Sequence, residues 1–256
     1  MAEIKVTFIG HASFRFESEQ SVTYFDAWFD DNPMADTTLA EVDRADLVIA
    51  THGHRDHIGD TYRLAKQTGA TFVGNFELCL VAAEHGLPIG ERALPMNPGG
   101  TVRVADLQVT MTQAHHSLSL AGHVLKGDLP ENMVFHPDSA VSGFVLAYDN
   151  GITIYDTSDT CVFSDMQLIG QMHGPQIAIM PVGGKFTMGV REAARAASFI
   201  QPDIVIPCHY GETMGQPADI DALSEAVRFL SPNTKVVGLE PGQSMRYTSS
   251  SFAVEE

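Results

Sequence analysis

The densest group of side chains that could carry out chemistry is the six-residue segment 52–57 (HGHRDH), which offers three imidazoles and one carboxylate. It directly follows a short apolar run (DLVIA) that is typical of a buried strand. Neutral imidazole and carboxylate are the ligands that borderline divalent metal ions favour. His52 and His54 can serve one ion, while Asp56 and His57 can serve a second. A solvated polar turn is the alternative, but clusters of this kind usually mark functional sites.

One segment cannot fill two coordination spheres, so this interpretation requires further ligands at the ends of other strands. Candidates follow three more predicted strands: His115 and His116 after 107–113, Asp156 and Asp159 after 152–155, and His209 after 204–207. Each of these taken alone is more often part of a capped turn. Their recurrence at successive strand ends favours a shared metal centre.

The elements that must position these side chains follow from the periodicity of the apolar residues. The predicted strands are 4–9, 13–17, 22–26, 46–50, 71–74, 143–148, 152–155, 176–180, 203–207 and 235–237, with a hairpin at 101–112. The predicted helices are 61–68, 77–85, 190–199 and 219–230. We expect the first three strands to form a meander that starts at a sheet edge. Two β-rich halves, each flanked by helices, predict an α/β fold with two packed sheets between outer helices, which is a four-layer αββα sandwich.

No linker rich in Pro, Gly or Ser divides the chain, so we expect residues 1–256 to form a single domain. The segment 117–142 breaks the pattern because it combines several glycines and prolines with scattered apolar residues. Long loops inside compact domains are commonly lids or binding loops. A lid or insertion is therefore one interpretation of this segment, and a peripheral excursion without function is the other.

The charge balance restricts the classes of partner. There are 32 acidic against 15 basic residues, which gives a formal net charge of −17. Such a surface repels the phosphate backbone of nucleic acids and anionic membranes, so we expect no general nucleic-acid binding. A pocket that holds two divalent cations could still attract an anionic small-molecule substrate. A homo-oligomer is compatible with the sequence.

The cysteines and the N-terminus favour a cytoplasmic protein. Cys79, Cys161 and Cys208 are odd in number and lack CxxC spacing, which argues against a disulfide framework or a thiolate zinc site. The N-terminus has no basic region followed by an uninterrupted apolar stretch. Nowhere do about 18 apolar residues run together, so we expect no membrane insertion.

Several motifs together resemble the metallo-β-lactamase superfamily, and within it the L-ascorbate-6-phosphate lactonase-like and UPF0173-type metal-dependent hydrolases. The resemblance covers nearly the whole chain. It rests on GHASF (10–14), FD (25–26), NP (32–33), THGHRDHIGD (51–60), AHHS (114–117), YDTSDTCVFSDM (155–166), PVGGKFTMG (181–189) and PCHY (207–210). The HxHxDH motif is specific for the superfamily, and the FTMG and PxHY pieces indicate this branch. The resemblance implies two mixed β-sheets flanked by helices.

The resemblance also implies a set of metal ligands. They are His52, His54 and His116 at the first ion, Asp56, His57 and His209 at the second, and Asp159 as a bridge between the two. The family pattern selects His116 over His115 and Asp159 over Asp156. Ser158 stands where the family usually has a glycine, and Asp156 where it more often has a histidine or an uncharged residue. These departures leave Asp156 as an additional acid or an outer partner of the site.

A centre of this kind implies hydrolysis by a metal-bound hydroxide, since two cations lower the pKa of a shared water molecule and polarise the scissile group. Asp56 or Asp159 could accept or return the proton. His11, in the GHASF loop, could contact the substrate or stabilise an oxyanion, and a structural turn histidine is the equal alternative. Zinc or manganese is the expected metal, and iron is compatible with the same ligands.

The leading functional hypothesis is hydrolysis of a small-molecule ester, with a lactone favoured by the resemblance. A phosphodiester is second, because the site motifs are poor in the Arg and Lys that such a substrate would favour. An iron-dependent oxidoreductase on the same scaffold is a further alternative, although the flavodiiron type has a glutamate where this chain has His54. A binding or regulatory protein without turnover is the last, and a complete ligand set argues against it.

Overall fold

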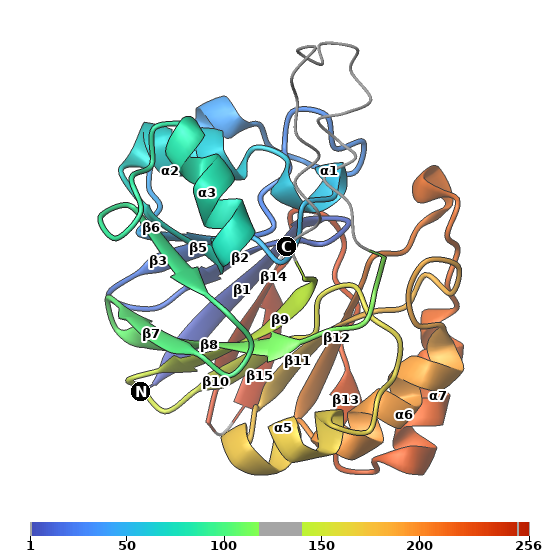
Figure 1. The fold of residues 1–256 in the computed structure, drawn as a ribbon. Coiled ribbons are helices and arrows are strands. Elements are labelled where there is room, and N and C mark those ends of the chain that lie inside the picture. Colours follow the sequence, from blue (N-terminus) through green and yellow to red (C-terminus); the bar gives the residue numbers. More distant parts are fainter. Residues whose placement is uncertain (1, 118–139, 250, 256) are drawn as a thin grey trace.

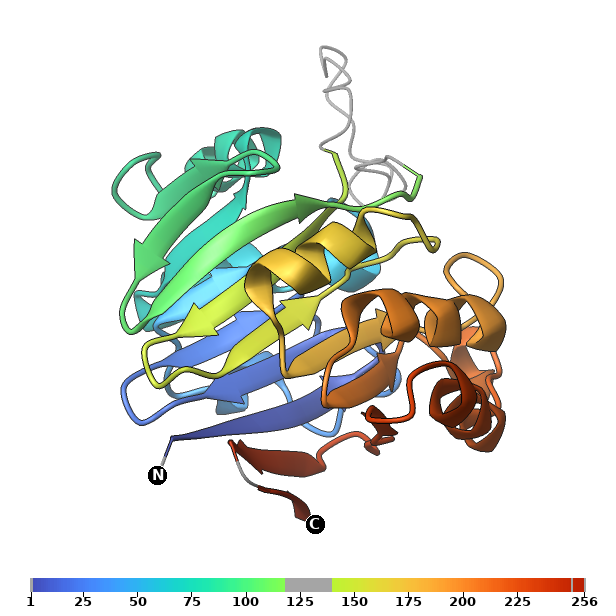
Figure 2. The same ribbon diagram turned by 90° about the horizontal axis from the view of Figure 1, so that it is seen from below.

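Two β-sheets pack face to face in the computed structural model, which describes residues 2–117, 140–249 and 251–255 (Figure 1). Helices cover the outer face of each sheet, as the view from below makes clear (Figure 2). The predicted four-layer αββα sandwich is therefore confirmed. The segment 117–142, expected to be a lid, an insertion or an excursion, lies almost entirely outside the described residues.

The first sheet has eight strands in the order β15-β14-β1-β2-β3-β4-β5-β6. They are β1 (Glu3–Gly10), β2 (Ser13–Glu17), β3 (Val22–Phe25), β4 (Leu47–Ile49), β5 (Thr71–Asn75), β6 (Ala93–Met96), β14 (Ser244–Thr248) and β15 (Ser251–Glu255). Pairing is antiparallel from β15 to β3 and parallel from β3 to β6. The predicted meander exists, but its expected start at a sheet edge is wrong, because β14 pairs with the outer side of β1.

The second sheet has seven strands in the order β13-β12-β11-β10-β9-β8-β7. They are β7 (Thr101–Val104), β8 (Leu107–Gln113), β9 (Ser142–Tyr148), β10 (Thr153–Asp156), β11 (Ile177–Pro181), β12 (Ile204–Cys208) and β13 (Lys235–Val236). It is antiparallel from β7 to β10 and parallel from β10 to β13. Both sheets are thus mixed, as expected.

Each sheet has its own helical layer. The helices α2 (Thr61–Thr68) and α3 (Phe76–Glu84) lie on the first sheet, and α5 (Met166–His173), α6 (Val190–Ile200) and α7 (Ile220–Leu230) lie on the second. Three short turns complete the described elements: α1 (Arg55–Ile58) and the 3-10 helices η1 (Leu39–Glu41) and η2 (Glu212–Met214).

Alternation along the strands divides the apolar core into layers. In β4, Leu47 and Ile49 face the other sheet, while Val48 between them packs under the helices. In β11, Ile177 likewise faces the sheet interface and Ala178 faces α6. Burying one Leu or Ile side chain contributes about 1.5–3 kcal/mol, so strands buried on both faces make a rigid platform for the loops at their ends.

Apart from the three short turns, four elements were not predicted, for physical reasons. In β6, Pro95 reads as a strand breaker, but β6 is an edge strand, where the missing N–H is tolerated. In α5, Gly170 reads as a helix breaker, yet a Cβ there would lie 2.6 Å from the carbonyl oxygen of Ile200, so glycine permits the close packing of α5 on α6. The hairpin of β14 and β15 is short and rich in serine, which hides its alternation.

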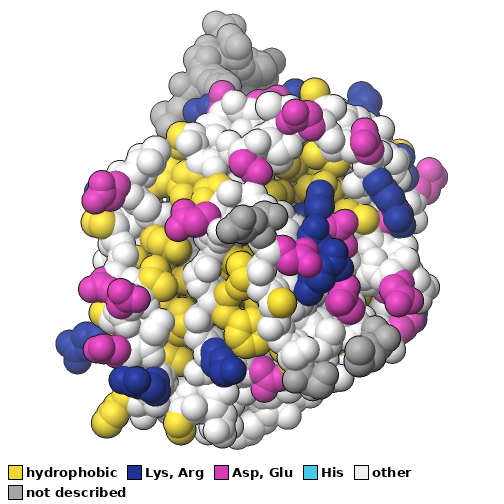
Figure 3. All heavy atoms as spheres, turned by 180° about the vertical axis from the view of Figure 1, so that it is seen from behind, with side chains coloured by type: hydrophobic (Ala, Val, Ile, Leu, Met, Phe, Trp, Pro, Cys, Tyr) yellow, Lys and Arg dark blue, Asp and Glu magenta, His cyan; other side chains and the backbone are white. Residues whose placement is uncertain are grey.

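The surface agrees with the acidic composition. Figure 3 shows Asp and Glu side chains scattered among Lys, Arg and apolar side chains over the face opposite to that of Figure 1, rather than gathered in one patch. Among the described helices, none is long and apolar enough to cross a membrane.

Candidate metal centre

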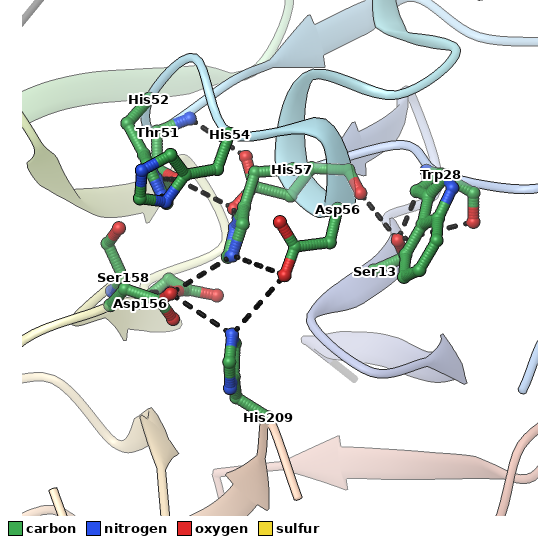
Figure 4. A network of polar contacts seen from close by, with 12 residues as sticks. Ser13, Trp28, Thr51, His52, His54, Asp56, His57, Asp156, Ser158 and His209 are labelled. Atoms are coloured by element: carbon green, nitrogen blue, oxygen red, sulfur yellow. Dashed lines mark hydrogen bonds and ion pairs between the residues drawn. The ribbon is translucent and has the colours of Figure 1, made fainter. Parts of the chain in front are cut away.

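The histidines and aspartates selected from the sequence converge at one edge of the sandwich, where both sheets contribute. His52 follows β4 of the first sheet. His116, Asp159 and His209 follow β8, β10 and β12 of the second sheet. Figure 4 shows Asp56, His57 and His209 pointing toward one another across the gap between the sheets. Strand ends that lie far apart in the sequence therefore meet at a single site.

The second half of the segment 52–57 forms the single-turn helix α1. His54 is the N-cap of this helix, and Asp56 and His57 lie on its turn. Gly59 ends the helix with φ 26°, and a Cβ at this position would lie 2.8 Å from both the carbonyl oxygen of Ala27 and Cβ of Trp28. Only glycine fits there, so α1 is held tightly against the 27–28 backbone.

Two groups of potential ligand atoms lie within this site. In each group, all the ligand atoms lie within 4.8 Å of one another. We call His52, His54, His116 and Asp159 the first cluster, and His11, Asp56, His57 and His209 the second cluster. The structure thus brings together all seven residues that the resemblance implies as ligands, and it adds His11.

In the first cluster the imidazoles face inward. Nε2 of His52 lies 2.9 Å from Nδ1 of His54, and Nδ1 of His52 lies 2.9 Å from Oγ1 of Thr51, which holds the ring in place. Nε2 of His116 lies 3.5 Å from Oδ2 of Asp159. Nitrogens of imidazole at such separations can share one cation.

Asp159 lies between the two clusters. Besides His116, its Oδ2 approaches Nε2 of His57 at 3.2 Å and Nε2 of His209 at 3.1 Å, and both of these rings belong to the second cluster. In the second cluster, Nε2 of His209 also lies 3.6 Å from Oδ2 of Asp56. Asp159 thus has the position that a carboxylate bridging two cations would take.

Asp26 supports His57 from behind, and the sequence had suggested no role for it. Its Oδ2 accepts hydrogen bonds from Nδ1 of His57 and Oγ1 of Thr51, both at 2.7 Å, and its Oδ1 accepts one from the backbone N–H of Thr51 at 2.8 Å. A carboxylate at Nδ1 fixes the tautomer and directs Nε2 at the cluster. The signal in the sequence was the FD motif at 25–26, which gave no role for the aspartate because its partner His57 comes 31 residues later.

In the second cluster, carboxylates raise the pKa values of the histidines that face them. Burial opposes a charge on His57, but the carboxylates of Asp159, Asp26 and Asp56 outweigh it and raise the pKa of His57 well above its usual value. Burial is likewise outweighed at His209, whose pKa rises to about 9 because of Asp159 and Asp56. A divalent cation would replace these protons.

The carboxylates show the opposite shift. Burial alone would raise the pKa of Asp159, but the facing His57 and His209 hold it well below its usual value. The pKa of Asp56 is also lowered, with His57, His11 and His209 outweighing burial. Both acids are therefore ionised at neutral pH, as metal ligands must be.

The first cluster holds neutral imidazoles. Burial lowers the pKa of His52 well below its usual value and also lowers those of His54 and His116. A neutral imidazole has a free lone pair for a cation. The two clusters therefore differ in how they are prepared to take a metal ion.

One buried atom tests whether this donor set fits a metal. Within the described part of the chain, Nε2 of His57 is buried and makes no hydrogen bond, although it lies 3.2 Å from Oδ2 of Asp159. Buried polar nitrogens are rarely left in this state, unless they face a partner such as a cation. Together with a donor set of imidazoles and carboxylates, this observation fits divalent ions such as zinc, manganese or iron.

Among the described ligand residues, exposure is concentrated on one side of the site. The side chain of Asp56 is 29% exposed and that of His116 is 10% exposed, and His54 is half-buried. The side chains of His57 and Asp159, in contrast, are 1% and 3% exposed. A substrate would therefore approach from the side of Asp56, His54 and His116.

His11 was expected at the substrate or in a structural turn. Its side chain is 0% exposed, and its Nε2 lies 3.0 Å from Oδ2 of Asp56. The ring centroid lies 3.9 Å from that of His209. The structure thus places His11 behind the ligands, away from the open side.

The backbone around the site is unusual. Six described residues other than glycine have positive φ, and four of them are His11, Asp26, Ser158 and His209. Such conformations cost energy and persist where surrounding contacts fix them, which happens most often at functional sites.

The two residues left open by the sequence lie outside both clusters. The exposed ring of His115 packs edge-on against Phe163, with the centroids 4.8 Å apart. Asp156 is buried, and it accepts a hydrogen bond from the backbone N–H of Ser158 at 2.9 Å. Burial and the nearby Asp26 raise its pKa well above the usual value. Asp156 thus supports the turn that leads to Asp159.

Comparison with known proteins agrees with this site. A family model described as a beta-lactamase superfamily domain matches residues 23–210, a range that contains every member of both clusters except His11. The UPF0173 metal-dependent hydrolase of Methanopyrus kandleri is 37% identical over 243 residues, which cover 94% of this chain and 99% of that protein. The corresponding protein of Chloroflexus aurantiacus is 37% identical over 245 residues, covering 94% and 97%.

A solved structure shows the same likeness in three dimensions. Igni18, described as a metallo hydrolase from the hyperthermophilic archaeon Ignicoccus hospitalis, matches with a TM-score of 0.81 at 28% identity. The match covers 96% of this chain and 99% of that one. The fold, the site and the sequence likeness therefore extend over the same part of the chain.

Proposed function

The chain belongs to the β-lactamase superfamily and to its UPF0173 metal-dependent hydrolases, and from this premise we propose that it hydrolyses a small-molecule ester at a centre of two divalent ions. A lactone is the first substrate class that we propose. The observation that carries the proposal is the place of Asp159, whose Oδ2 faces His116 of one cluster and both His57 and His209 of the other. A carboxylate shared in this way suits two adjacent cations.

The residues divide the work in a simple way. His52, His54 and His116 would hold one ion, Asp56, His57 and His209 the other, and Asp159 both. Zinc or manganese is the proposed metal, because the donor set contains imidazole and carboxylate without thiolate. Divalent cations held by these residues would supply a bound water of lowered pKa and would polarise the scissile carbonyl.

Asp56 is the proposed proton carrier. It is ionised, and its side chain is 29% exposed, whereas that of Asp159 is 3% exposed. Asp56 can therefore accept a proton from the attacking water and return it to the leaving oxygen. The reaction adds water across the C–O bond of the lactone ring and yields a hydroxy acid. Asp159 keeps its place between the ligand rings throughout.

A phosphodiester is the second substrate class, and the charges around the site give it less support. Arg55 lies beside the ligand segment, but its guanidinium pairs with Asp31 at 2.5 Å. Lys185 is the basic residue of the PVGGKFTMG motif, and its Nζ lies 4.9 Å above the ring of Phe186. Neither of these basic side chains is held in a position for binding a phosphate. This preference for a carboxylic ester is the part of the proposal that a substrate panel tests.

The test compares hydrolysis of lactones, phosphodiesters and β-lactams by protein loaded with zinc or with manganese. His116→Ala removes a ligand of the first cluster, and His115→Ala is its matched control, since the adjacent ring packs on Phe163 outside both clusters. We expect turnover of a lactone by the wild type and by His115→Ala, and a loss of at least about 100-fold in His116→Ala. Turnover of phosphodiesters alone would replace the substrate class. No hydrolysis of any panel by fully loaded protein would overturn the proposal, and a single iron per chain in the protein as isolated would favour the oxidoreductase alternative.

A further inference from the structure

His11 is a fully buried polar residue that the proposed reaction does not use. It lies between β1 and β2, with φ 59°, and follows Gly10, with φ 143°. The sequence therefore places a histidine in a left-handed conformation, where glycine would be less strained. A strained residue at a site is an observation that asks for a functional reason.

The contacts of His11 supply such a functional reason. Its Nε2 lies 3.0 Å from Oδ2 of Asp56 with the geometry of a hydrogen bond. Its carbonyl oxygen accepts a hydrogen bond from the backbone N–H of His209 at 2.7 Å. His11 thus touches two residues of the second cluster that come from different sheets.

The direction of the imidazole separates two roles for His11. In the described chain, Nε2 of His57 does not point at a carboxylate oxygen with hydrogen-bond geometry, whereas Nε2 of His11 points at Oδ2 of Asp56. A carboxylate oxygen has two lone pairs, so Oδ2 of Asp56 can accept a hydrogen bond from His11 and still face a cation. The geometry favours an N–H donor over a direct ligand.

Asp56 is the ligand that most needs such support. Its side chain is 29% exposed, whereas those of His57 and His209 are 1% and 3% exposed. A carboxylate at the open side of a site would otherwise sample several rotamers. A buried donor beneath it restricts the carboxylate to the orientation that faces His57 and His209.

We propose that His11 is a positioning residue that donates its Nε2–H to Asp56 and thereby fixes the ligand geometry of the second cluster. It does not touch the substrate, because its side chain is 0% exposed behind Asp56. This inference rests on the proposed two-ion centre. It replaces the substrate contact or oxyanion role that the GHASF loop had suggested.

The test uses three variants and measures metal affinity rather than turnover. His11→Gln keeps an N–H donor near the position of Nε2, whereas His11→Ala removes it. His11→Gly also removes the donor, but it suits the left-handed backbone and so remains folded if the alanine variant does not. Zinc binding is measured by competition with a chromogenic chelator, and folding is checked by circular dichroism and thermal melting.

We expect the second zinc ion to bind about 10–100-fold more weakly in His11→Ala and His11→Gly, with the first ion unchanged. His11→Gln should bind both ions nearly as the wild type does. Its cobalt(II)-loaded form should keep the visible absorption spectrum of the wild type, because the ligand atoms are the same.

Three results would overturn the inference in distinct ways. A weak second site and an altered cobalt spectrum in His11→Gln would make His11 a direct ligand. Two ions bound with wild-type affinity in both His11→Ala and His11→Gly would leave His11 without a role in the centre, while the two-ion proposal stands. A wild-type protein that takes up one ion only would overturn the two-ion centre and this inference together.

Discussion

The two clusters are held in different ways. In the second cluster, two side chains have a hydrogen-bond partner behind them, Asp26 at His57 and His11 at Asp56, and the backbone N–H of His209 donates to the carbonyl oxygen of His11. In the first cluster, the described residues show such support at His52, from Thr51, and His54 is half-buried. The second cluster is thus braced by hydrogen bonds, while solvent reaches the centre through Asp56 of that cluster and through His54 and His116 of the first.

This difference suggests a division of roles. In the braced cluster, the carboxylates raise the pKa of His57 and His209 despite burial, so this part of the site favours positive charge. In the first cluster, burial lowers the pKa of His54 and His116, whose rings stay partly exposed. The second cluster should therefore tolerate the loss of a supporting partner less well than the first.

Removal of a central ligand of the braced cluster should have the largest effect. In His57→Ala we expect metal content to fall from two ions to about one, and turnover to fall by at least about 100-fold, because Asp26 and Asp159 both lose their bridging ring. Elemental analysis of the dialysed protein measures the first effect. Retention of both ions would show that His57 is not a ligand.

Replacement of the supporting carboxylate should have the next largest effect. In Asp26→Asn one of the two acceptor oxygens becomes an NH2 group and the negative charge is lost, so the three hydrogen bonds from His57 and Thr51 cannot all be kept and the imidazole is held less firmly. We expect affinity for the second ion to fall about 10–100-fold, measured by chelator competition. Asp106→Asn is the matched control. Asp106 is also buried and accepts hydrogen bonds from Ser18 and Ser21, so this change should lower stability without altering metal affinity.

The site could be predicted most directly from segment 52–57. Its ligands are adjacent in the chain, so residue types alone indicated a metal site. The ligands of the other sheet come one at a time, and the sequence offered two histidines at 115–116 and two aspartates at 156 and 159. Choosing between them required a family pattern, because the direction of a side chain after a strand depends on how that strand ends.

Support from behind could not be predicted from the sequence. Asp26 acts on His57, which is 31 residues away, and His11 acts on Asp56, which is 45 residues away. Neither pair has a spacing that a helix or strand would impose. They meet only because β3 and β4 are parallel neighbours and because α1 packs against the 27–28 backbone. The layers of the fold were predictable, since alternation of apolar residues specifies them locally.

The end of α1 offers a sharper test of how rigidly the braced side is held. Gly59→Ala should destabilise the protein by about 2 kcal/mol or more, because the added Cβ would press on the backbone of Ala27 and on Trp28. Gly69→Ala is the matched control. It also has a positive φ, but nothing lies within 4 Å of its Cβ position, so only about 1 kcal/mol should be lost. Chemical denaturation measures both values, and equal losses would contradict the tight packing of α1.

The smallest effect is expected at the turn before Asp159. Ser158 has φ 59°, so Ser158→Gly should stabilise the protein by about 0.5–1 kcal/mol and leave metal content unchanged. Gln201→Gly, at the C-terminus of α6 with φ 56°, serves as a control for the same backbone relief away from the site. Loss of a metal ion in Ser158→Gly would show that the serine side chain, and not only the turn, places Asp159.

The most direct measurement of the two-ion centre is an anomalous-difference map from crystals of protein loaded with zinc, collected on both sides of the zinc absorption edge. We expect two peaks, one among His52, His54 and His116 and one among Asp56, His57 and His209, with Asp159 in contact with both. A single peak, or none in fully loaded protein, would contradict the two-ion centre on which the proposed hydrolysis depends.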